Sequence, residues 1–297
     1  MRKNKFKLIN YHLMLAPGTV ALLIFSYLPM LGLIMAFQNY VPAKGFFRSK
    51  WVGLDNFKYI FSLPDSKLIF ANTLIIAVLK IIVGLIVAIG FALLLNEIRL
   101  KAAKKTIQTL VYLPHFLSWV VLATVVRNIF DYTGPVNYII QMLGGDPVIF
   151  LASNTWFRPI IILTSTWKEF GFDSVVYLAA LTSIDPGLYE AASLDGANRF
   201  HKMLHVTLPG IAPTIVLMTA LSLGKVLNAG FDQIFNLYNP LVYETADIID
   251  TYVYRVGLID MQYSLATAVG LMKSVIGFIL IMSSNLLSKK LANYQIF

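Results

Sequence analysis

The sequence contains no cysteine among its 297 residues, and only 13% of its residues are charged. Without cysteine the chain forms no disulfide, no thiolate metal site and no cysteine nucleophile. An average soluble domain is about 25% charged, so this small share cannot cover the surface of a soluble globule of this length. The chain is also 58% hydrophobic with a mean hydropathy of +0.71, which favours a membrane protein.

Motifs for catalysis and for nucleotide binding are missing as well. No G-x-x-x-x-G-K-S/T occurs, so the chain encodes no loop that holds phosphates. No H-E-x-x-H and no G-x-S-x-G occurs, so membrane protease or esterase chemistry has no local support. The net charge of +9 would suggest nucleic acid in a soluble protein, but in a membrane protein it fits cytoplasmic loops. We therefore expect neither an enzyme nor a nucleic-acid-binding protein.

Long uncharged runs predict an all-α protein that crosses the membrane several times. Leu13–Phe37 contains no charge and exceeds the roughly 20 apolar residues that span a bilayer as a helix. A signal peptide has a shorter apolar region of about 7–15 residues, so we expect this run to be a retained span. Six spans are predicted in total, at Leu13–Phe37, Ile69–Leu95, Leu110–Phe130, Ile160–Thr182, Ile211–Ala229 and Leu265–Leu287.

The distribution of Lys and Arg predicts the orientation of these spans. Six spans place both termini on one side, and basic loops mark the cytoplasmic side. With the termini inside, the inner segments hold twelve Lys and Arg residues and the outer segments hold seven. The first outer loop, rich in Lys, runs against this rule. We predict cytoplasmic termini and one membrane domain over residues 1–297.

A polar segment, SIDPGLYEAASLDGANRFHKMLHVTLPG at residues 183–210, separates the fourth and fifth predicted spans. Asp185 suits a helix N-cap with Pro186 at the first helical position, and Gly196 suits a positive φ after the helix. A second helix follows, and Leu208-Pro209 is expected to close the unit and lead into the next span. The pattern predicts a helix, a glycine turn and a helix on the cytoplasmic face.

Two interpretations of this segment stay open on physical grounds. Short amphipathic helices often lie on the membrane surface between spans. The adjacent small residues Ala191 and Ala192 instead favour the docking of another protein, because small side chains allow close approach.

The same residues resemble the EAA loop of ABC importer permeases. That pattern is EAA, three residues, Gly, nine residues and I-x-L-P, and here Glu190-Ala191-Ala192 is followed by Gly196 and by Val206-Thr207-Leu208-Pro209. Val206 replaces the usual Ile. The resemblance covers nearly the whole chain, and YHLMLAPGTVALLIFSYLPMLGLIMAFQNY, WVGLDNFKYIF and VYLPHFLSWVV look like the carbohydrate-importer branch, especially permeases for oligosaccharides and polysaccharide fragments.

The resemblance implies a fold, a location and a set of partners. The fold has six transmembrane helices with both termini inside, in the bacterial cytoplasmic membrane, and the chain is one half of a heterodimer with a second, similar permease. Two ATPase subunits carry the ATP and Mg, so this chain needs no cofactor, and an extracytoplasmic binding protein delivers the oligosaccharide. The loop over residues 183–210 couples to the ATPase through Glu190, Ala191, Ala192, Asp195, Gly196, Leu208 and Pro209. The particular sugar is not implied. The alternative is a stand-alone secondary transporter, but such proteins often contain internal repeats, and none is evident.

Ionisable residues inside the predicted spans form a candidate substrate path. Each is costly in a membrane, so such residues usually face a bundle interior or an aqueous cavity. In the fourth span Ser165, Glu169, Asp173 and Tyr177 recur every four residues and share one helical face. The further candidates are Trp119, Trp167, Lys168 and, on one predicted face of the fifth span, Lys225, Asn228 and Asp232.

The alternative for these residues is structural ion pairing, for example of Glu169 or Asp173 with Lys225 or Lys273. Lys80 lies within the second predicted span. His115 follows Pro114 near the third span, and we interpret it as a helix-end or packing residue rather than a metal ligand, since no second His is spaced for a site. Pro114 and Pro209 are expected to be helix-entry or kink positions.

Overall fold

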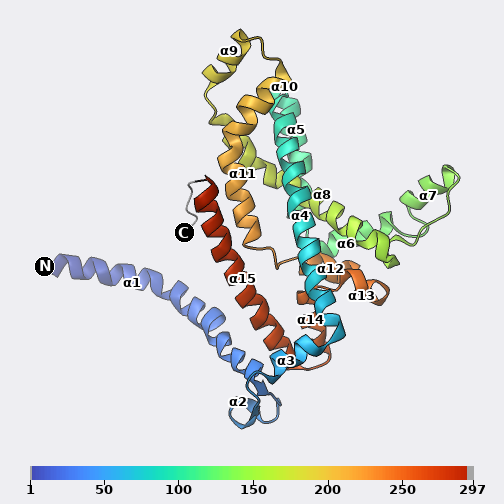
Figure 1. The fold of residues 1–297 in the computed structure, drawn as a ribbon. Coiled ribbons are helices and arrows are strands. Elements are labelled where there is room, and N and C mark those ends of the chain that lie inside the picture. The colour runs from blue at the N-terminus through green and yellow to red at the C-terminus, as the bar shows by residue number, and fades with distance from the viewer. Residues whose placement is uncertain (1, 293–297) are drawn as a thin grey trace. The chain divides into compact units, whose positions relative to one another are not determined.

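The computed structural model describes the backbone of residues 2–292 and the side chains of residues 11–283, and nearly all of its regular structure is helical (Figure 1). The first part of the chain forms α1 (Arg2–Leu22), which continues through a π turn (Leu23–Tyr27) and a 3-10 helix (Leu28–Phe37), then β1 (Gln38–Asn39), α2 (Gly45–Arg48), β2 (Lys50–Trp51), α3 (Asp55–Ser62) and α4 (Pro64–Asn96). Next come α5 (Lys101–Tyr112), a 3-10 turn (Leu113–Phe116), α6 (Trp119–Ile129), α7 (Pro135–Met142), a 3-10 turn (Phe150–Ala152), α8 (Asn154–Thr182) and α9 (Pro186–Leu194). The last part forms α10 (Arg199–Lys202), a π turn (Met203–Thr207), α11 (Leu208–Leu223), α12 (Phe231–Leu237), a 3-10 turn (Pro240–Val242), α13 (Tyr243–Ala246), α14 (Ile249–Tyr254), a π turn (Arg255–Ile259) and α15 (Tyr263–Ala292).

The chain divides into two compact units. The first comprises Met1–Ser66 and Tyr252–Met272, and the second comprises Lys67–Thr251 and Lys273–Phe297. In the first unit β1 and β2 form an antiparallel ribbon that pairs Gln38 with Trp51 and Asn39 with Lys50. The Asn56 amide donates to the backbone oxygens of Ala36 and Gln38 at 2.8 and 3.0 Å, which ties α3 to this ribbon.

Four helices within the described residues are long and apolar enough to cross a membrane. They are Tyr11–Phe37, Pro64–Asn96, Arg199–Leu223 and Tyr263–Ser283, and each overlaps a predicted span. A fifth crossing is possible if the bent pair Lys101–Phe116 and Trp119–Ile129 counts as one span. The fourth predicted span is a continuous helix, α8, but charged residues leave it outside this apolar set.

The third predicted span is wrong as a continuous helix. The chain turns by 104° between Phe116 and Trp119. Leu117 adopts an extended conformation, and the Ser118 hydroxyl accepts from the backbone N–H of Val121 at 3.4 Å as the N-cap of α6. Pro114 lies in the 3-10 turn just before this break, as expected of a kink position.

The fifth predicted span is shifted along the chain. Its helix begins at Arg199 and ends at Leu223, because turns over residues 224–227 and a positive φ of 97° at Gly230 interrupt it before α12. Leu208-Pro209 leads into the membrane helix, as predicted, and Pro209 lies in the first turn of α11. A π turn in which the Leu208 N–H donates to the Met203 oxygen carries the helix past Pro209 without a break.

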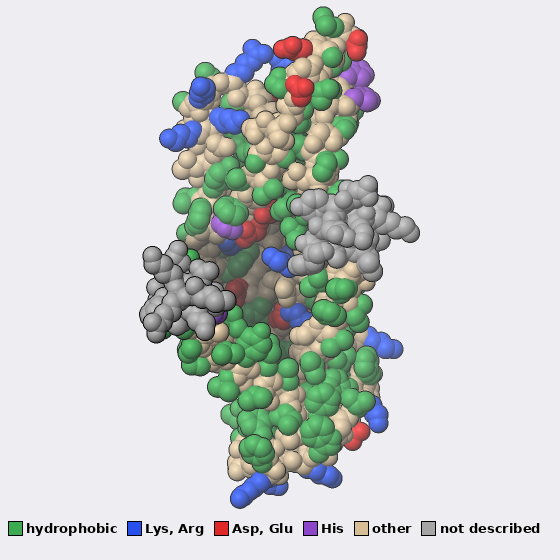
Figure 2. Space-filling view, turned by 90° about the vertical axis from the view of Figure 1, so that its left-hand side faces the viewer, with side chains coloured by type: hydrophobic (Ala, Val, Ile, Leu, Met, Phe, Trp, Pro, Cys, Tyr) green, Lys and Arg blue, Asp and Glu red, His purple; other side chains and the backbone are tan. Residues whose placement is uncertain are grey.

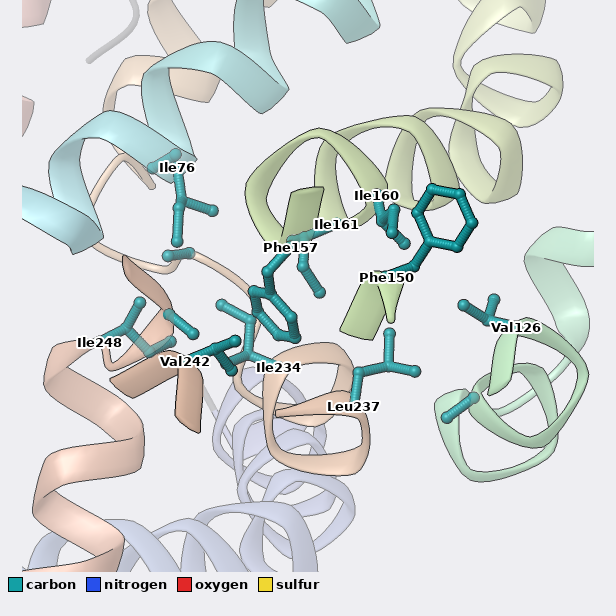
Figure 3. Close-up of a cluster of buried hydrophobic side chains, with 14 of the residues drawn as sticks. Ile76, Val126, Phe150, Phe157, Ile160, Ile161, Ile234, Leu237, Val242 and Ile248 are labelled. Carbon is teal, nitrogen blue, oxygen red and sulfur yellow. The ribbon is translucent and has the colours of Figure 1, made fainter. Parts of the chain in front are cut away.

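A hydrophobic core within the second unit holds these broken elements together (Figure 3). Phe157 and Ile161 from α8 are fully buried against Ile76 of α4 and Ile234 of α12. Figure 3 shows Val126 of α6 at the edge of the same cluster. The core therefore fixes both segments that follow a helix break, α6 and α12, against α8.

Gly171 allows α8 to approach the end of α5 closely. A Cβ at this position would lie 2.5 Å from the carbonyl oxygen of Val111 and 2.6 Å from its Cγ1, closer than real Cβ contacts come. Gly90 in α4 has no heavy atom within 4 Å of the same position. The two glycines therefore form a matched pair, one at a helix contact and one in open space.

We predict that Gly171→Ala lowers stability by about 1–3 kcal/mol, the usual cost of overpacking. Gly90→Ala should be neutral or slightly stabilising, because alanine is a better helix former than glycine. The midpoint of thermal aggregation in detergent, followed by fluorescence-detected size exclusion, compares the variants. Equal midpoints for both would contradict the close packing of α5 on α8.

Candidate functional site

A cavity of about 200 Å³ lies between α4, α8 and α11. The four residues that the sequence places on one face of α8 all line it, namely Ser165, Glu169, Asp173 and Tyr177. The rest of the lining comes from Lys80, Ile81, Gly84, Leu85 and Ala88 of α4, Thr166 and Phe170 of α8, and Met218 and Ser222 of α11. Figure 2 shows acidic, basic and histidine side chains inside a recess in the middle of the face it presents.

Two polar atoms of the cavity lining have no partner among the described residues. The Tyr177 hydroxyl and the Thr166 hydroxyl are both buried without a hydrogen bond. Buried polar groups in proteins are nearly always hydrogen-bonded, to the protein itself, to water or to a ligand. These two hydroxyls are therefore available to a polar molecule that enters the cavity.

A charged cluster joins the cavity to the helix break after Phe116. The Lys168 ammonium donates to the backbone oxygen of His115 at 2.5 Å and lies 3.3 Å from Glu169 Oε1. The other oxygen of Glu169 lies 2.6 Å from His115 Nδ1. The His115 ring stacks on Phe172 at 3.9 Å, and the Trp119 ring centroid is 6.0 Å from Lys168 Nζ.

This cluster corrects two expectations from the sequence. The carboxylate of Glu169 pairs with His115 and Lys168, not with Lys225 or Lys273. His115 is indeed at a helix end, but it also bonds directly to a residue of the cavity. Its partner Glu169 lies 54 positions away, so no local sequence pattern pointed to this contact.

The other intramembrane lysines are held by structural partners. Lys80 donates to the Ala229 backbone oxygen at 2.7 Å and to Gln233 Oε1 at 2.5 Å. Gln233 in turn donates to the Ile161 oxygen and the Thr164 hydroxyl of α8 at 2.8 and 2.9 Å. Sequence reasoning singled out Lys80 but missed Gln233, because an amide in a short helix carries no distinctive pattern.

Lys273 forms an ion pair with Asp250 at 2.6 Å. This contact lies outside the cavity lining, so Lys273 is a structural residue in this arrangement.

Several predicted path residues do not reach the cavity. Lys225 and Asn228 lie in the turns after α11 and Asp232 lies in the first turn of α12, so the three share no helical face, and all are exposed. Trp167 is 44% exposed on the outside of α8, and Trp119 is partly exposed at the start of α6.

The segment over residues 183–210 folds as predicted at its glycine turn. Asp185 caps α9 by accepting from the Gly187 N–H at 2.9 Å. Gly196 has a φ of 77°, and the Ala197 N–H donates to the Ala192 oxygen at 2.9 Å, which closes the helix C-terminus in a Schellman motif. Asn198 then caps α10 by accepting from the His201 N–H at 2.9 Å.

Side-chain bonds fix α9 to the helix that follows it. Tyr189 and Thr207 are joined through their hydroxyls at 3.0 Å, and Lys202 donates to the Ser193 hydroxyl at 2.6 Å. Glu190, Ala191 and Asp195 stay exposed, whereas Ala192 is half-buried. Ala192, Asp195 and Gly196 also line a shallow hollow of about 360 Å³, together with Ala197, His201, His205 and Val206.

The segment therefore projects as a rigid unit at one end of the second unit (Figure 1). Figure 2 shows acidic and histidine side chains gathered on this projecting end. Large apolar side chains are exposed there as well, with Leu188 at 54% and Leu194 at 90%. A folded projection with both charged and apolar exposed groups suits contact with another protein.

The chain combines long apolar helices, a polar cavity between them and a rigid projecting loop. This combination fits an integral membrane component of a transport system. The family model described as "Binding-protein-dependent transport system inner membrane component" matches residues 80–293, and the chain belongs to this family. It is therefore a multi-pass membrane protein and a transport subunit rather than an enzyme, as predicted.

Several known proteins are similar to this chain over nearly its full length. Protein LplB of Bacillus subtilis (strain 168) is 45% identical over 94% of this chain and 88% of LplB. The polygalacturonan/rhamnogalacturonan transport system permease protein YteP of the same organism is 43% identical over 96% of this chain and 89% of YteP. In the crystal structure of a bacterial alginate ABC transporter with an alginate pentasaccharide-bound periplasmic protein, one chain is 40% identical, with a TM-score of 0.90 over 99% of both chains.

We predict that Lys80→Met destabilises the protein by about 1.5–3 kcal/mol, because it leaves the Ala229 oxygen and the Gln233 amide without their charged donor. Lys225→Met removes an exposed lysine of the same region and should change stability by less than about 0.5 kcal/mol. Thermal midpoints in detergent compare the two. A similar effect of both substitutions would argue against the Lys80 bonds as a structural link.

Proposed function

We propose that this chain is one permease half of an ATP-driven importer for oligosaccharides or polysaccharide fragments. The observation that carries the proposal is the polar cavity lined by Glu169, Asp173 and Tyr177 beside a helix that leads directly into the projecting loop. The similar proteins support the substrate class, since the name of YteP refers to polygalacturonan and rhamnogalacturonan and the solved neighbour imports alginate.

The proposed membrane topology has six crossings with both termini in the cytoplasm. Four crossings are the apolar helices, the fifth is the bent pair α5–α6, and the sixth is α8. The polar residues of α8 favour this assignment, because a helix that faces a cavity inside a bundle needs less apolar surface. The projecting loop then lies on the cytoplasmic side.

The proposed complex contains a second, similar permease, two ATPase subunits and an extracytoplasmic binding protein. A periplasmic protein accompanies the alginate transporter in its crystal structure, which supports the last of these partners. ATP and Mg belong to the ATPase subunits in this proposal. The contact residues on this chain are Glu190, Ala191, Ala192, Asp195 and Gly196, with Leu208 and Pro209 in the helix behind them.

The mechanism follows from the continuity of one helix. Arg199–Leu223 begins within the projecting loop and carries Met218 and Ser222 into the cavity lining, a distance of roughly 35 Å at about 1.5 Å per residue. A push on α9 passes to this helix through the Tyr189–Thr207 and Lys202–Ser193 bonds. Movement of the helix against α8 would then open or close the cavity.

Sugar recognition in the cavity would use both hydrogen bonds and apolar contacts. Asp173 and the free Tyr177 hydroxyl offer bonds to sugar hydroxyls, while Phe170 and Leu85 offer apolar surface. Glu169 is already engaged by His115 and Lys168, so it serves the cavity mainly as a fixed charge. The alternative of a stand-alone secondary transporter finds no support among the similar proteins.

The coupling role predicts a nucleotide-dependent cross-link. Because the chain has no native cysteine, Ala192→Cys introduces its only thiol. Paired with one cysteine in the docking groove of the ATPase subunit, it should form a disulfide whose yield changes with ATP. Asn228→Cys, exposed outside the projecting loop, is the matched control and should not cross-link. Absence of the Ala192 cross-link in an assembled, active complex would contradict the coupling role.

If Tyr177 lines the substrate path, its substitution should reduce transport but leave assembly of the complex unchanged. Tyr177→Phe deletes a hydroxyl that has no protein partner, so the amount of assembled complex should not change. Uptake at low substrate should fall about two- to tenfold, the value of one hydrogen bond. Tyr132→Phe, at an exposed position outside the cavity, controls for loss of a phenol. Radiolabelled oligosaccharide uptake into proteoliposomes measures the effect, and unchanged uptake would remove Tyr177 from the path.

A further inference from the structure

The first unit contains a second polar cavity, at the point where the ribbon β1–β2 and α3 meet the start of α15. Its volume is about 280 Å³. The lining comes from Asn39, Tyr40, Asn56, Tyr59, Met261, Gln262, Tyr263, Ser264 and Leu265. The lining thus contains three tyrosines and three side-chain amides, so the cavity is polar, unlike a gap between packed apolar side chains.

Contacts between lining residues join the elements around the cavity. The Tyr40 N–H donates to the Ser264 hydroxyl at 2.8 Å, which ties the ribbon to the start of α15. The rings of Tyr40 and Tyr263 meet edge to face at 6.1 Å. Met261 adopts a φ of 56°, a left-handed conformation that is unfavourable for a side chain of this kind. Such strain persists where the surrounding structure fixes it, and it concentrates at ligand sites.

The groups at the cavity surface are free to bind. Within the described residues, the side-chain amides of Asn39 and Gln262 and the hydroxyls of the three tyrosines have no hydrogen-bond partner, in contrast to the bonded amide nitrogen of Asn56. Tyrosine rings pack on the C–H faces of sugars, and amides bond to their hydroxyl groups. Ligand sites for drug-sized molecules measure roughly 300–1,000 Å³, so this cavity admits about one sugar unit.

Positive charge lies beside this cavity. The ribbon pairs Asn39 directly with Lys50, and residues opposite each other on an antiparallel pair project from the same face. Lys50 is exposed, and no ion pair of Lys50 occurs within the described residues. Residues 38–63 contain Lys44, Arg48, Lys50 and Lys58 but only one acid, Asp55, which lies 3.5 Å from Lys58. This is the loop whose charge runs against the positive-inside rule.

The proposed topology places this cavity on the outer face. Residues 38–63 lie between the first and second crossings, and residues 261–262 directly precede the last crossing, Tyr263–Ser283. Both segments are outside the membrane on the outer face if the termini are cytoplasmic.

We propose that this tyrosine and amide cavity is an outer binding site for one sugar unit that carries a carboxylate, with Lys50 as the group that selects the charge. The proposal rests on the proposed function and adds to it the acidic class of substrate. It also explains the basic outer loop, because cations kept outside the membrane against the usual bias attract an acidic saccharide before it enters the path.

The test measures sugar binding to the assembled permease and ATPase complex in nanodiscs, without a solute-binding protein. The probes are tetragalacturonate, which is acidic, and maltotetraose, which is neutral and of equal length, titrated by saturation-transfer difference NMR. Tyr263→Ala should weaken tetragalacturonate binding about three- to tenfold, the effect of losing one aromatic contact. Gln262→Ala should also weaken it, and this exposed amide can be removed without loss of a structural bond.

Charge selection has its own pair of variants. Lys50→Gln should weaken tetragalacturonate binding about three- to fivefold and leave maltotetraose binding unchanged. Lys44→Gln removes an exposed cation of the same loop outside the ribbon and should change neither. Equal losses for both probes in Lys50→Gln would overturn the role of Lys50.

Three results would overturn the site itself. The first is that the wild-type complex binds no tetragalacturonate. The second is that the variants bind it as well as the wild type does. The third is that the signal appears only with the solute-binding protein, which would identify this surface as a contact for that protein. Uptake into proteoliposomes with the solute-binding protein present is measured in parallel. If oligosaccharide is taken up but does not bind at this cavity, only the outer binding site is contradicted. If no oligosaccharide is taken up at all, the proposed function is contradicted.

Discussion

Two lysines that bond to backbone oxygens at helix breaks hold this structure together. A lysine in an apolar layer is costly unless its ammonium group is bonded. Backbone carbonyl groups at a helix break have no partner within a helix, and a buried one needs a donor from elsewhere. Lys168 of α8 donates to His115 at the break before α6, and Lys80 of α4 donates to Ala229 at the break before α12. Each contact satisfies a cation and a free carbonyl together.

The cavity depends on these two contacts. Lys80 also lines the cavity, and Lys168 fixes the neighbouring carboxylate of Glu169, so the groups that hold the breaks are the ones that set the cavity charge. The core around Phe157 and Ile234 supports the same arrangement closer to the N-terminus of α8. The helix Arg199–Leu223 is not broken, and it connects the cavity lining to the projecting loop. Continuous helices thus line the cavity, and the elements after the helix breaks brace them.

The sequence predicts the periodic features well and the breaks poorly. A step of four residues places Ser165, Glu169, Asp173 and Tyr177 on one face of α8, and the structure brings all four to one cavity. Gly196 was expected at a positive φ, which is confirmed, because few residues other than glycine suit that position. The breaks after Phe116 and Leu223 interrupt apolar runs that carry no clear change of composition. Ser118, Gly224 and Gly230 were the available local signals.

The partners of the polar residues could not be predicted for a different reason. Three of the relevant acceptors are backbone oxygens, at His115, Ala229 and Ile161, and a backbone oxygen has no sequence signature. Pairing by side-chain charge alone therefore assigned Glu169 to distant lysines, although the neighbouring Lys168 and the more remote His115 bind it. Lys225, Asn228 and Asp232 were expected on one helical face, but the helix that was to carry them ends at Leu223.

The projecting loop and the cavity-lining helix are expected to move as one rod. Two spin labels test this directly, at His201→Cys in the loop and at the exposed Leu221→Cys near the cavity, in a chain with no other thiol. Pulsed electron double resonance on the assembled complex measures the distance between them with and without ATP. A single narrow distance that stays the same in both states is predicted. A distance that changes or broadens with nucleotide would mean that the helix bends at its π turn, and would contradict the claim.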